Sequence, residues 1–470
     1  MGNDNKLKNV DIVDALLNIK VSKLKDKGKA LKNNVKHIAK LLNDLDEDKE
    51  YNKYLSLSCI YGAFLGDSMG SACEFLEESS KNHELIFEPK LKQVFKPGEI
   101  TDDSEMALSA AFAYIDILKE EDSSKSKDYL YFYFCLWRNS SPKDIGNTTE
   151  IALKNWKGED INETKFDFEE VKRVNWGSLA NGALMRISTF IVYYYYKKFD
   201  KLHLIISKCF SKDNNQVNQV NLNSDLFNLY LDIYNEVFNN VQITHPNYEN
   251  GISCALFTLM TLIGMFTKDA KKIYAFFKEI SESPQFIDIH DKILFNYAKE
   301  TQKKYKQIIS EIETNKPISV YTHMGYYIHA FKLSVYFLYK YPDMGENKDK
   351  DLYYKIMCDI CDKGGDTDTN CAIVGTLIGP LIGYKNFNTK NKNLFKTFIE
   401  FIPPKRTQFT SAFIYEYVNY LEKNTLNKDK NKDKDKNETN KSNKGFQYTA
   451  LQMIQKFLNE DIYGKKNKNK

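Results

Sequence analysis

Two dense groups of acidic and hydroxyl side chains stand out in the sequence. Residues 101–105 read Thr-Asp-Asp-Ser-Glu, and residues 366–369 read Asp-Thr-Asp-Thr. Each group precedes an apolar run with helical spacing, so its simplest role is to cap a helix, where a carboxylate contributes up to about 1 kcal/mol. A cap needs one oxygen atom, however, and each group supplies several.

Carboxylates and hydroxyl groups at this density are the ligands that hard divalent cations prefer. If the four aspartate carboxylates were buried together, they would repel one another and take up protons unless a cation neutralised them. We therefore expect both groups to meet in the folded chain and to hold two Mg²⁺ or Mn²⁺ ions. No HExxH motif or Cys/His zinc spacing competes with this prediction, and the pair Cys358 and Cys361 is expected to be core thiols.

Helices must position these groups, because apolar residues recur at intervals of three and four positions through most of the chain. Residues 105–118, 252–266 and 325–340 show this period clearly, and only ten prolines interrupt the chain. Residues 129–137 (YLYFYFCLW) are the best candidate for a strand, but their helical neighbours favour a helix there. The sequence therefore predicts an all-α fold.

Two sets of glycines are spaced four apart, at positions 62, 66 and 70 and at positions 375, 379 and 383. On a helix each set forms a bare stripe. A glycine inside a helix costs about 1 kcal/mol relative to alanine, so six of them require a reason. The reason is either tight packing between helices or the close approach of a ligand.

Composition divides the chain into four parts. Residues 1–50 are a charged arm, helical or disordered, and residues 51–421 form one continuous domain with a polar insert at about 211–224. Residues 422–445 are a Lys/Asn/Asp-rich insertion that is expected to be disordered, because it has almost nothing to bury. A C-terminal helix and a basic tail are expected in residues 446–470.

The net charge of +4 gives no reason to expect nucleic acid as a partner. The eight cysteines lie mostly in apolar runs, which indicates reduced thiols in an intracellular, cytoplasmic protein. The longest apolar run, residues 254–266, is too short to span a bilayer, so no membrane association is expected. We expect a monomer.

Six blocks, in this order, resemble the ADP-ribosylglycohydrolase family, nearest to the dinitrogenase-reductase-activating type. They are GAFLGDSMGSACEF (62–75), FKPGEITDDSEMALS (95–109), SPKDIGNT (141–148), NGALMR (181–186), ITHPN (243–247) and GGDTDTN (364–370). The resemblance implies a compact, orthogonal all-α domain with a binuclear Mg²⁺ or Mn²⁺ centre. It also implies removal of ADP-ribose from modified protein side chains, or action on related ADP-ribosyl compounds.

The resemblance also implies site residues. The metal ligands would be Thr101, Asp102, Asp103, Asp366, Asp368 and Thr369. Glu74 or Asp103 would deprotonate the attacking water. The substrate cleft would be lined by Asp144, Gly146, Asn147, Thr148, Asn181, Gly182 and His245, although a structural histidine is the stronger reading of His245.

The linkage is expected to be ADP-ribosyl-arginine, because a cationic guanidinium pairs well with a carboxylate such as Asp144. Glu74 weakens this expectation, because family branches that cleave ADP-ribosyl-serine carry a glutamate there too. Two rival functions are an inactive ADP-ribose-binding protein and a helical metal-dependent phosphohydrolase. Filled metal-ligand positions argue against the first, and the absence of histidines from both acidic groups argues against the second.

Overall fold

The computed structural model describes residues 40–77, 98–120, 122–156, 158, 160–210, 222–346, 349–387, 398 and 406–426. Most of the predicted N-terminal arm, the predicted helix and tail at 446–470 and residues 211–221 of the predicted insert lie outside these ranges. The same holds for residues 427–445 of the Lys/Asn/Asp-rich segment.

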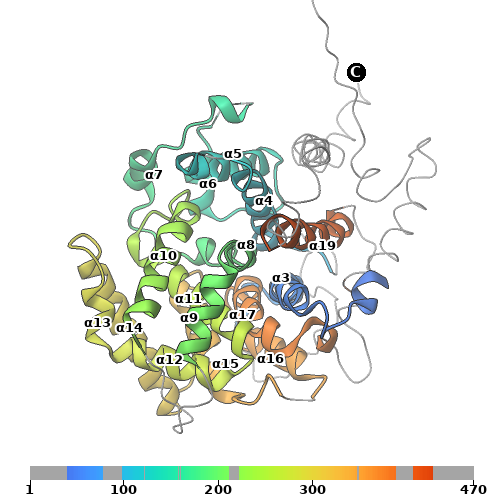
Figure 1. Cartoon of the computed structure of the whole chain (residues 1–470). Coiled ribbons are helices and arrows are strands. Elements are labelled where there is room, and N and C mark those ends of the chain that lie inside the picture. Colours follow the sequence, from blue (N-terminus) through green and yellow to red (C-terminus); the bar gives the residue numbers. More distant parts are fainter. Residues whose placement is uncertain are drawn as a thin grey trace, which may run out of the picture.

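The described residues fold into helices, with no strand among them apart from one isolated bridge between Ala180 and Tyr326. This confirms the predicted all-α fold (Figure 1). In chain order the α-helices are α3 (Tyr51–Gly70), α4 (Asp102–Ile117), α5 (Ser126–Asn139), α6 (Asn147–Leu153), α7 (Phe168–Asn175), α8 (Ser188–Lys197), α9 (Phe199–Cys209), α10 (Ser224–Val241), α11 (Tyr248–Thr267), α12 (Ala270–Glu282), α13 (Pro284–Asp288), α14 (Phe295–Glu313), α15 (Tyr327–Lys340), α16 (Leu352–Asp362), α17 (Thr367–Ile382) and α19 (Arg406–Thr425). Short 3₁₀ turns are η1 (Ser123–Lys125), η2 (Ile161–Glu163), η3 (Asn181–Ala183) and η4 (Tyr384–Asn386).

Helices α3 and α17 make the most extensive helix–helix contact in the described structure. A Cβ atom on Gly62 would lie 2.3 Å from the carbonyl oxygen of Gly375, and one on Gly66 would lie 2.4 Å from that of Cys371. The glycine stripes therefore face each other and let the two backbones touch. Of the two explanations that the sequence left open, helix packing accounts for these glycines.

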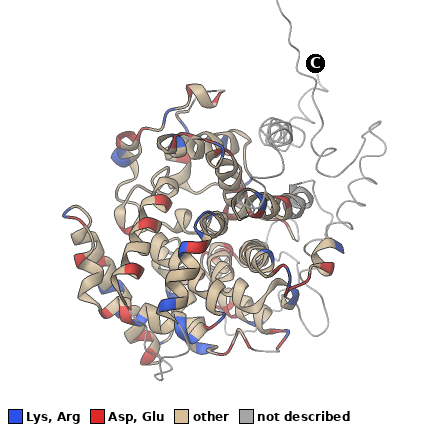
Figure 2. Cartoon of the chain, in the orientation of Figure 1, with Lys and Arg blue, Asp and Glu red and all other residues tan. Residues whose placement is uncertain are grey.

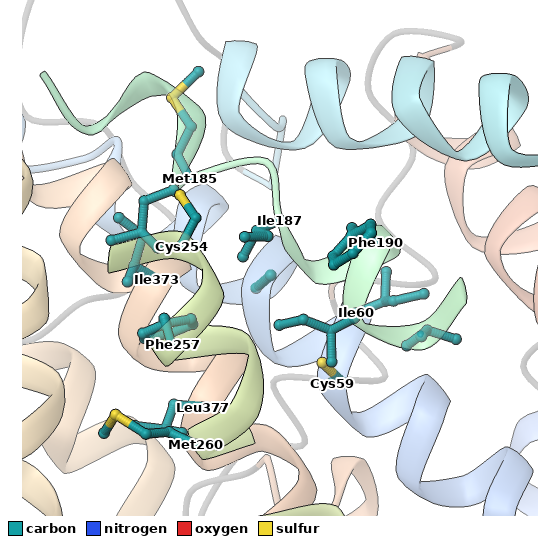
Figure 3. Close-up of a cluster of buried hydrophobic side chains, with 14 of the residues drawn as sticks. Cys59, Ile60, Met185, Ile187, Phe190, Cys254, Phe257, Met260, Ile373 and Leu377 are labelled. Atoms are coloured by element: carbon teal, nitrogen blue, oxygen red, sulfur yellow. The ribbon is translucent and has the colours of Figure 1, made fainter. Parts of the chain in front are cut away.

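An apolar cluster fills the space between α3, the start of α8, α11 and α17 (Figure 3). Its side chains are almost completely removed from water, and each has a fractional exposure of 5% or less. Because four helices contribute to it, this cluster fixes α3 and α17 relative to the rest of the domain. The labelled members are Cys59, Ile60, Met185, Ile187, Phe190, Cys254, Phe257, Met260, Ile373 and Leu377.

By length and composition alone, α11 could cross a membrane: it has 20 residues and a mean hydropathy of 1.5. The apolar run 254–266, which by itself was predicted to be too short to span a bilayer, is part of this longer helix. In the fold, 89% of the apolar window of α11 is buried inside the protein, as in a core helix.

Residues 129–137 are helical, as favoured, and lie within α5. All eight cysteines are free thiols. Cys361 is buried with its Sγ atom 4.0 Å from that of Cys371, while Cys358 is half-buried, so this pair forms part of the core as expected.

Structured residues lie close to the ends of three predicted segments. Leu42 and Leu45 are buried in the main core, and the Tyr384 hydroxyl donates a hydrogen bond to the Leu42 carbonyl (2.6 Å), so the end of the predicted arm packs against the domain. Helix α19 continues through Thr425, beyond the predicted end at residue 421. Helix α10 begins at Ser224, inside the predicted insert, because Asn223 caps it.

Candidate active site

The first acidic group begins α4, but its side chains do not cap the helix. Thr101, the N-cap residue, makes no side-chain capping bond. Instead the carboxylate of Asp67, from α3, accepts hydrogen bonds from the backbone amides of Thr101 (3.1 Å) and Ser104 (3.2 Å) and from the Ser104 hydroxyl (2.5 Å). Because a neighbouring helix supplies the cap, Asp102 and Asp103 remain available for another role.

The second acidic group begins α17 in a similar way. Asp366 occupies the N-cap position without a side-chain capping bond. Gly364 and Gly365, just before it, have φ angles of +69° and +78°, which only glycine adopts readily, and they turn the chain sharply into the helix. The side-chain amide of Asn181, in η3, donates to Asp366 Oδ2 at 2.6 Å and so orients this carboxylate.

The structure brings both acidic groups together. The hydroxyls of Thr101 and Thr369 both donate to Asp103 Oδ2 at 3.2 Å, although Thr369 lies 266 residues away from Asp103 in the chain. Two sets of three carboxylates come close together: within each set, one oxygen from each residue lies within 4.8 Å of the other two. Both sets include Asp368. They are Asp67, Asp103 and Asp368, and Glu74, Asp366 and Asp368.

Most of these carboxylates are buried without a cationic partner. No ion pair between described residues includes any of them, although Lys, Arg, Asp and Glu are spread over many of the helices (Figure 2). Removal from water, with the repulsion of neighbouring carboxylates, raises the pKa of Asp103 and of Asp368 well above the ordinary value. A divalent cation would relieve this repulsion and hold the carboxylates in their ionised form.

The same causes act at the edge of the cluster. Burial, together with the charges of Asp366, Asp144 and Asp67, raises the pKa of the half-buried Glu74 to about 8. Burial raises the pKa of Asp67 to about 6, and the hydrogen bonds from Ser104 and Thr101 oppose this rise. The site is therefore built for positive charge.

The predicted cleft residues 144–148 precede and begin α6. The charge of Asp144 contributes to the raised pKa of both Glu74 and Asp102, after burial. Gly146 and Asn147 are exposed, and a Cβ atom on Gly146 would meet nothing within 4 Å. The hydroxyl of Thr148 is hydrogen-bonded to that of Ser178 (2.9 Å), which ties this segment to the chain before η3.

His245 lies behind the predicted ligand-binding turn. It is 1% exposed, its Nδ1 is hydrogen-bonded to the Thr244 hydroxyl (2.7 Å), and a Cβ atom on Gly182 would lie 2.7 Å from its ring. Burial lowers its pKa to about 3, so the ring is neutral at neutral pH. This geometry favours a structural role for His245 over a role in substrate binding.

Comparison with known proteins decides the family. The sequence model of the ADP-ribosylglycohydrolase family matches residues 49–210 and 225–401. The chain belongs to the ADP-ribosylglycohydrolase family. As a member it is a glycohydrolase that removes ADP-ribose from ADP-ribosylated substrates. The matched segments leave out residues 211–224, where the polar insert was predicted.

Individual relatives carry related names. A protein of Acanthamoeba polyphaga mimivirus with the provisional name ADP-ribosyl glycohydrolase L543 is 24% identical over 341 residues, covering 69% of this chain and 86% of its own length. The ADP-ribosyl-[dinitrogen reductase] glycohydrolase of Rhodospirillum rubrum is 29% identical over 137 residues, or 28% of this chain and 42% of the relative. A solved structure named ADP-ribosylglycohydrolase-related protein complex covers 78% of this chain and 99% of its own, with 15% identity and a TM-score of 0.45.

The donor set of this ADP-ribosylglycohydrolase fits hard divalent cations. All candidate ligands are carboxylate or hydroxyl oxygens, and Asp103 Oδ1 is buried without any hydrogen-bond partner. A buried carboxylate oxygen without a donor is costly, and a cation would compensate for this cost. Asp102 belongs to neither oxygen set, although the sequence grouped it with Asp103.

Sequence reasoning missed Asp67. The residue lies in α3 between Gly66 and Gly70, in a stretch that is otherwise buried and mostly apolar. A lone carboxylate in such a stretch could have indicated a functional residue, because a charged side chain is rarely buried without a specific partner. Its partners here are the first amides of α4, which local sequence does not reveal.

Proposed function

We propose that the enzyme hydrolyses the bond between C1″ of ADP-ribose and an arginine side chain of a modified protein, with two Mg²⁺ or Mn²⁺ ions as cofactors. The observation that carries this proposal is the pair of oxygen sets that share Asp368 at the meeting point of α4 and α17. Shared carboxylates of this kind suit a binuclear centre.

The proposed ligands are the aspartate carboxylates of the two oxygen sets, joined by the hydroxyls of Thr101 and Thr369. Asp102 lies beside them and is a further candidate, through its position next to Asp103 in the first turn of α4. When bound, the cations supply positive charge that binds ribose hydroxyls and favours ionisation of a water molecule.

Among the chain's own residues, we assign proton transfer from water to Glu74. Its side chain is only half-buried, whereas Asp103 is 1% exposed and accepts hydrogen bonds from two threonines. Glu74 is therefore better placed to meet a water molecule, and nearby positive charge would bring its pKa down into the range of a general base. The same carboxylates stabilise the positive charge that develops on the ribose as the bond breaks.

The diphosphate is assigned to the Asn181–Gly182 turn and the neighbouring residues 146–148. Asn181 contacts Asp366, and Gly182 lies near Thr149 of α6, so this turn connects the acidic cluster with the start of α6. Exposed backbone at Gly146 and Asn147 suits an anionic ligand.

The arginine linkage rests on Asp144 and on the partial similarity to the enzyme from Rhodospirillum rubrum. A planar, cationic guanidinium leaving group can pair with the Asp144 carboxylate, whereas the hydroxyl of serine gains little from it. ADP-ribosyl-serine is the second candidate, because Glu74 suits either linkage.

The test is release of ADP-ribose from ADP-ribosyl-arginine and ADP-ribosyl-serine peptides, with Mg²⁺, with Mn²⁺ and after treatment with EDTA. We expect faster release from arginine, complete loss with EDTA and recovery with either cation. Asp144→Asn should lower kcat/KM about tenfold or more on the arginine peptide and little on the serine peptide. Asp200→Asn, an exposed position in the first turn of α9, is the control. Equal losses from Asp144→Asn on both peptides would remove the basis for arginine preference.

Two finer expectations belong with this proposal. The absence of disulfides among the eight cysteines supports an intracellular enzyme, and the net charge of +4 gives no reason to expect nucleic acid as a partner. We propose that the monomer is active; light scattering coupled to gel filtration, run at assay concentration, tests this.

A further inference from the structure

Arg186 is a completely buried cation behind the Asn181–Gly182 turn. Its side chain is 0% exposed, and no carboxylate of the described residues forms an ion pair with it. Burial lowers its pKa to about 10, so the guanidinium stays charged at neutral pH. Buried charges in proteins are normally paired, so this arrangement requires an explanation.

Neutral groups solvate the guanidinium on all sides. Its Nε donates to Asn240 Oδ1 (2.8 Å), Nη2 donates to the Asn240 carbonyl (2.9 Å), and Nη1 donates to the Gly182 carbonyl (3.0 Å) and the Thr244 hydroxyl (2.8 Å). The ring of Phe134 packs against it at 4.5 Å. These dipoles reduce the free-energy cost of burying the positive charge, but they do not neutralise it.

The hydrogen bonds connect Arg186 to the catalytic centre through a short chain of contacts. Arg186 holds the Gly182 carbonyl, and Asn181 in the same turn holds Asp366. Thr244 links the guanidinium to His245, whose ring fills the space beside Gly182. The amide of Gly182 has no acceptor within the described part of the chain, although the residue is buried.

We propose that Arg186 is a positioning residue for the anionic half of the substrate, and that its unpaired charge favours the diphosphate at the Asn181–Gly182 turn. This inference rests on the proposed function, because it takes ADP-ribose as the ligand. The charge acts through a low-dielectric interior, where one unit charge several ångströms away changes anion affinity by about tenfold or more. Arg186 itself stays behind the turn and does not touch the reacting atoms.

The sharpest test cancels the charge without removing the side chain. Asn240→Asp places a carboxylate at the acceptor of the Arg186 Nε bond and can keep both the Arg186 and Tyr114 contacts, now with the Tyr114 hydroxyl as donor. We expect the Kd of ADP-ribose, measured by calorimetry with Mn²⁺ present, to rise about tenfold. The Kd of Mn²⁺ alone should change less than about twofold. Asn239→Asp, which adds the same charge one residue away, is the matched control and should change neither constant by more than about twofold.

Arg186→Met and Arg186→Lys separate charge from packing. If the charge matters, the methionine variant should lose about tenfold or more in ADP-ribose affinity, and the lysine variant should lose clearly less. Arg173→Met, at an exposed position of α7, is the control. Unchanged ADP-ribose affinity in a folded Asn240→Asp protein would overturn the proposal, even if the Arg186 variants fail to fold. A wild-type protein that does not bind ADP-ribose would instead overturn the proposed function, and this inference with it.

Discussion

Asp368 is the carboxylate that both oxygen sets share. It is 1% exposed, it follows the sharp glycine turn into α17, and one of its oxygens already accepts the backbone amide of Thr369 (2.9 Å). The position of this residue therefore depends on the helix start and on the close approach of α17 to α3 at Gly70. Its replacement should affect chemistry far more than folding.

We predict that Asp368→Asn lowers kcat/KM about 100-fold or more, because both proposed cation sites lose an anionic ligand. The melting temperature of the cation-free protein should stay equal or rise, since one buried like charge is removed. Activity assays and thermal melts in EDTA measure the two effects. Asp359→Asn, which affects only the ion pairs of this residue with Lys340 and Lys363, should retain activity. Full turnover of Asp368→Asn at saturating Mg²⁺ would contradict the assignment.

His245 gives a pH prediction whose sign follows from its lowered pKa. The folded ring binds a proton only near pH 3, whereas an unfolded histidine does so below its ordinary pKa of 6.5. Lowering the pH through 6.5 therefore favours the unfolded chain, and at pH 5 this costs about 2 kcal/mol. We predict that wild type loses about this much more stability than His245→Asn between pH 7.5 and pH 5.

Denaturant melts of both proteins at the two pH values measure this difference. Other titrating groups are common to both proteins and cancel in the comparison. A parallel pH dependence in the two proteins would mean that His245 takes up its proton in the folded state, and would remove the evidence for a buried neutral ring.

At the scale of elements, the α3–α17 pair is the platform of the site. The side chain of Asp67, on α3, caps α4, and the side chain of Asp368, on α17, lies near that of Asp103. The distance between α3 and α17 therefore sets the separation of these carboxylates. The backbones can touch only because Gly62, Gly66 and Gly375 carry no side chain. The glycines therefore serve the site indirectly, through the geometry of its two supporting helices.

We predict that Gly66→Ala destabilises the protein by about 3 kcal/mol or more, because its Cβ atom would lie 2.4 Å from the carbonyl oxygen of Cys371, a backbone atom that cannot move easily. Cation affinity should fall as well. Gly177→Ala is the control, since a Cβ atom there meets nothing within 4 Å. Chemical denaturation compares the two variants, and equal stability would show that the helices can separate at little cost.

At the scale of the whole molecule, the described helices form one body around a shared core. Segments that are far from the active-site residues in sequence still contribute side chains to this core. Leu42 and Leu45 pack into this core before α3 begins, and Val418 and Leu421 of α19 are fully buried in it. Buried core residues therefore lie before residue 51, and at the C-terminal end they reach residue 421.

We predict that deleting residues 427–444 and rejoining the ends leaves kcat/KM within about twofold of wild type. This stretch is dominated by Lys, Asn and Asp and has almost nothing to bury. The cut is placed after Thr425 so that α19 stays intact. Activity and melting temperature are the measurements; a fall of several degrees in the melting temperature would show that these residues contribute to the fold.

The sequence by itself determined the helices and the acidic groups, because both depend on neighbours within a few positions. Helical neighbours predicted a helix at residues 129–137 despite their aromatic content, and residues 101–105 predicted the start of α4. The motif blocks added the family and its expected ligands. None of this required knowledge of which helix lies beside which.

Only the tertiary structure decided which helix faces meet, because contacts between residues more than 200 positions apart depend on the packing of the whole core. It paired the glycine stripes with each other, brought Thr369 to Asp103, and added Asp67 to the cluster while it left Asp102 outside both oxygen sets. It also left Arg186 buried among neutral acceptors. A one-dimensional pattern shows that a side chain is charged, but burial and partners, which decide what that charge does, arise from packing.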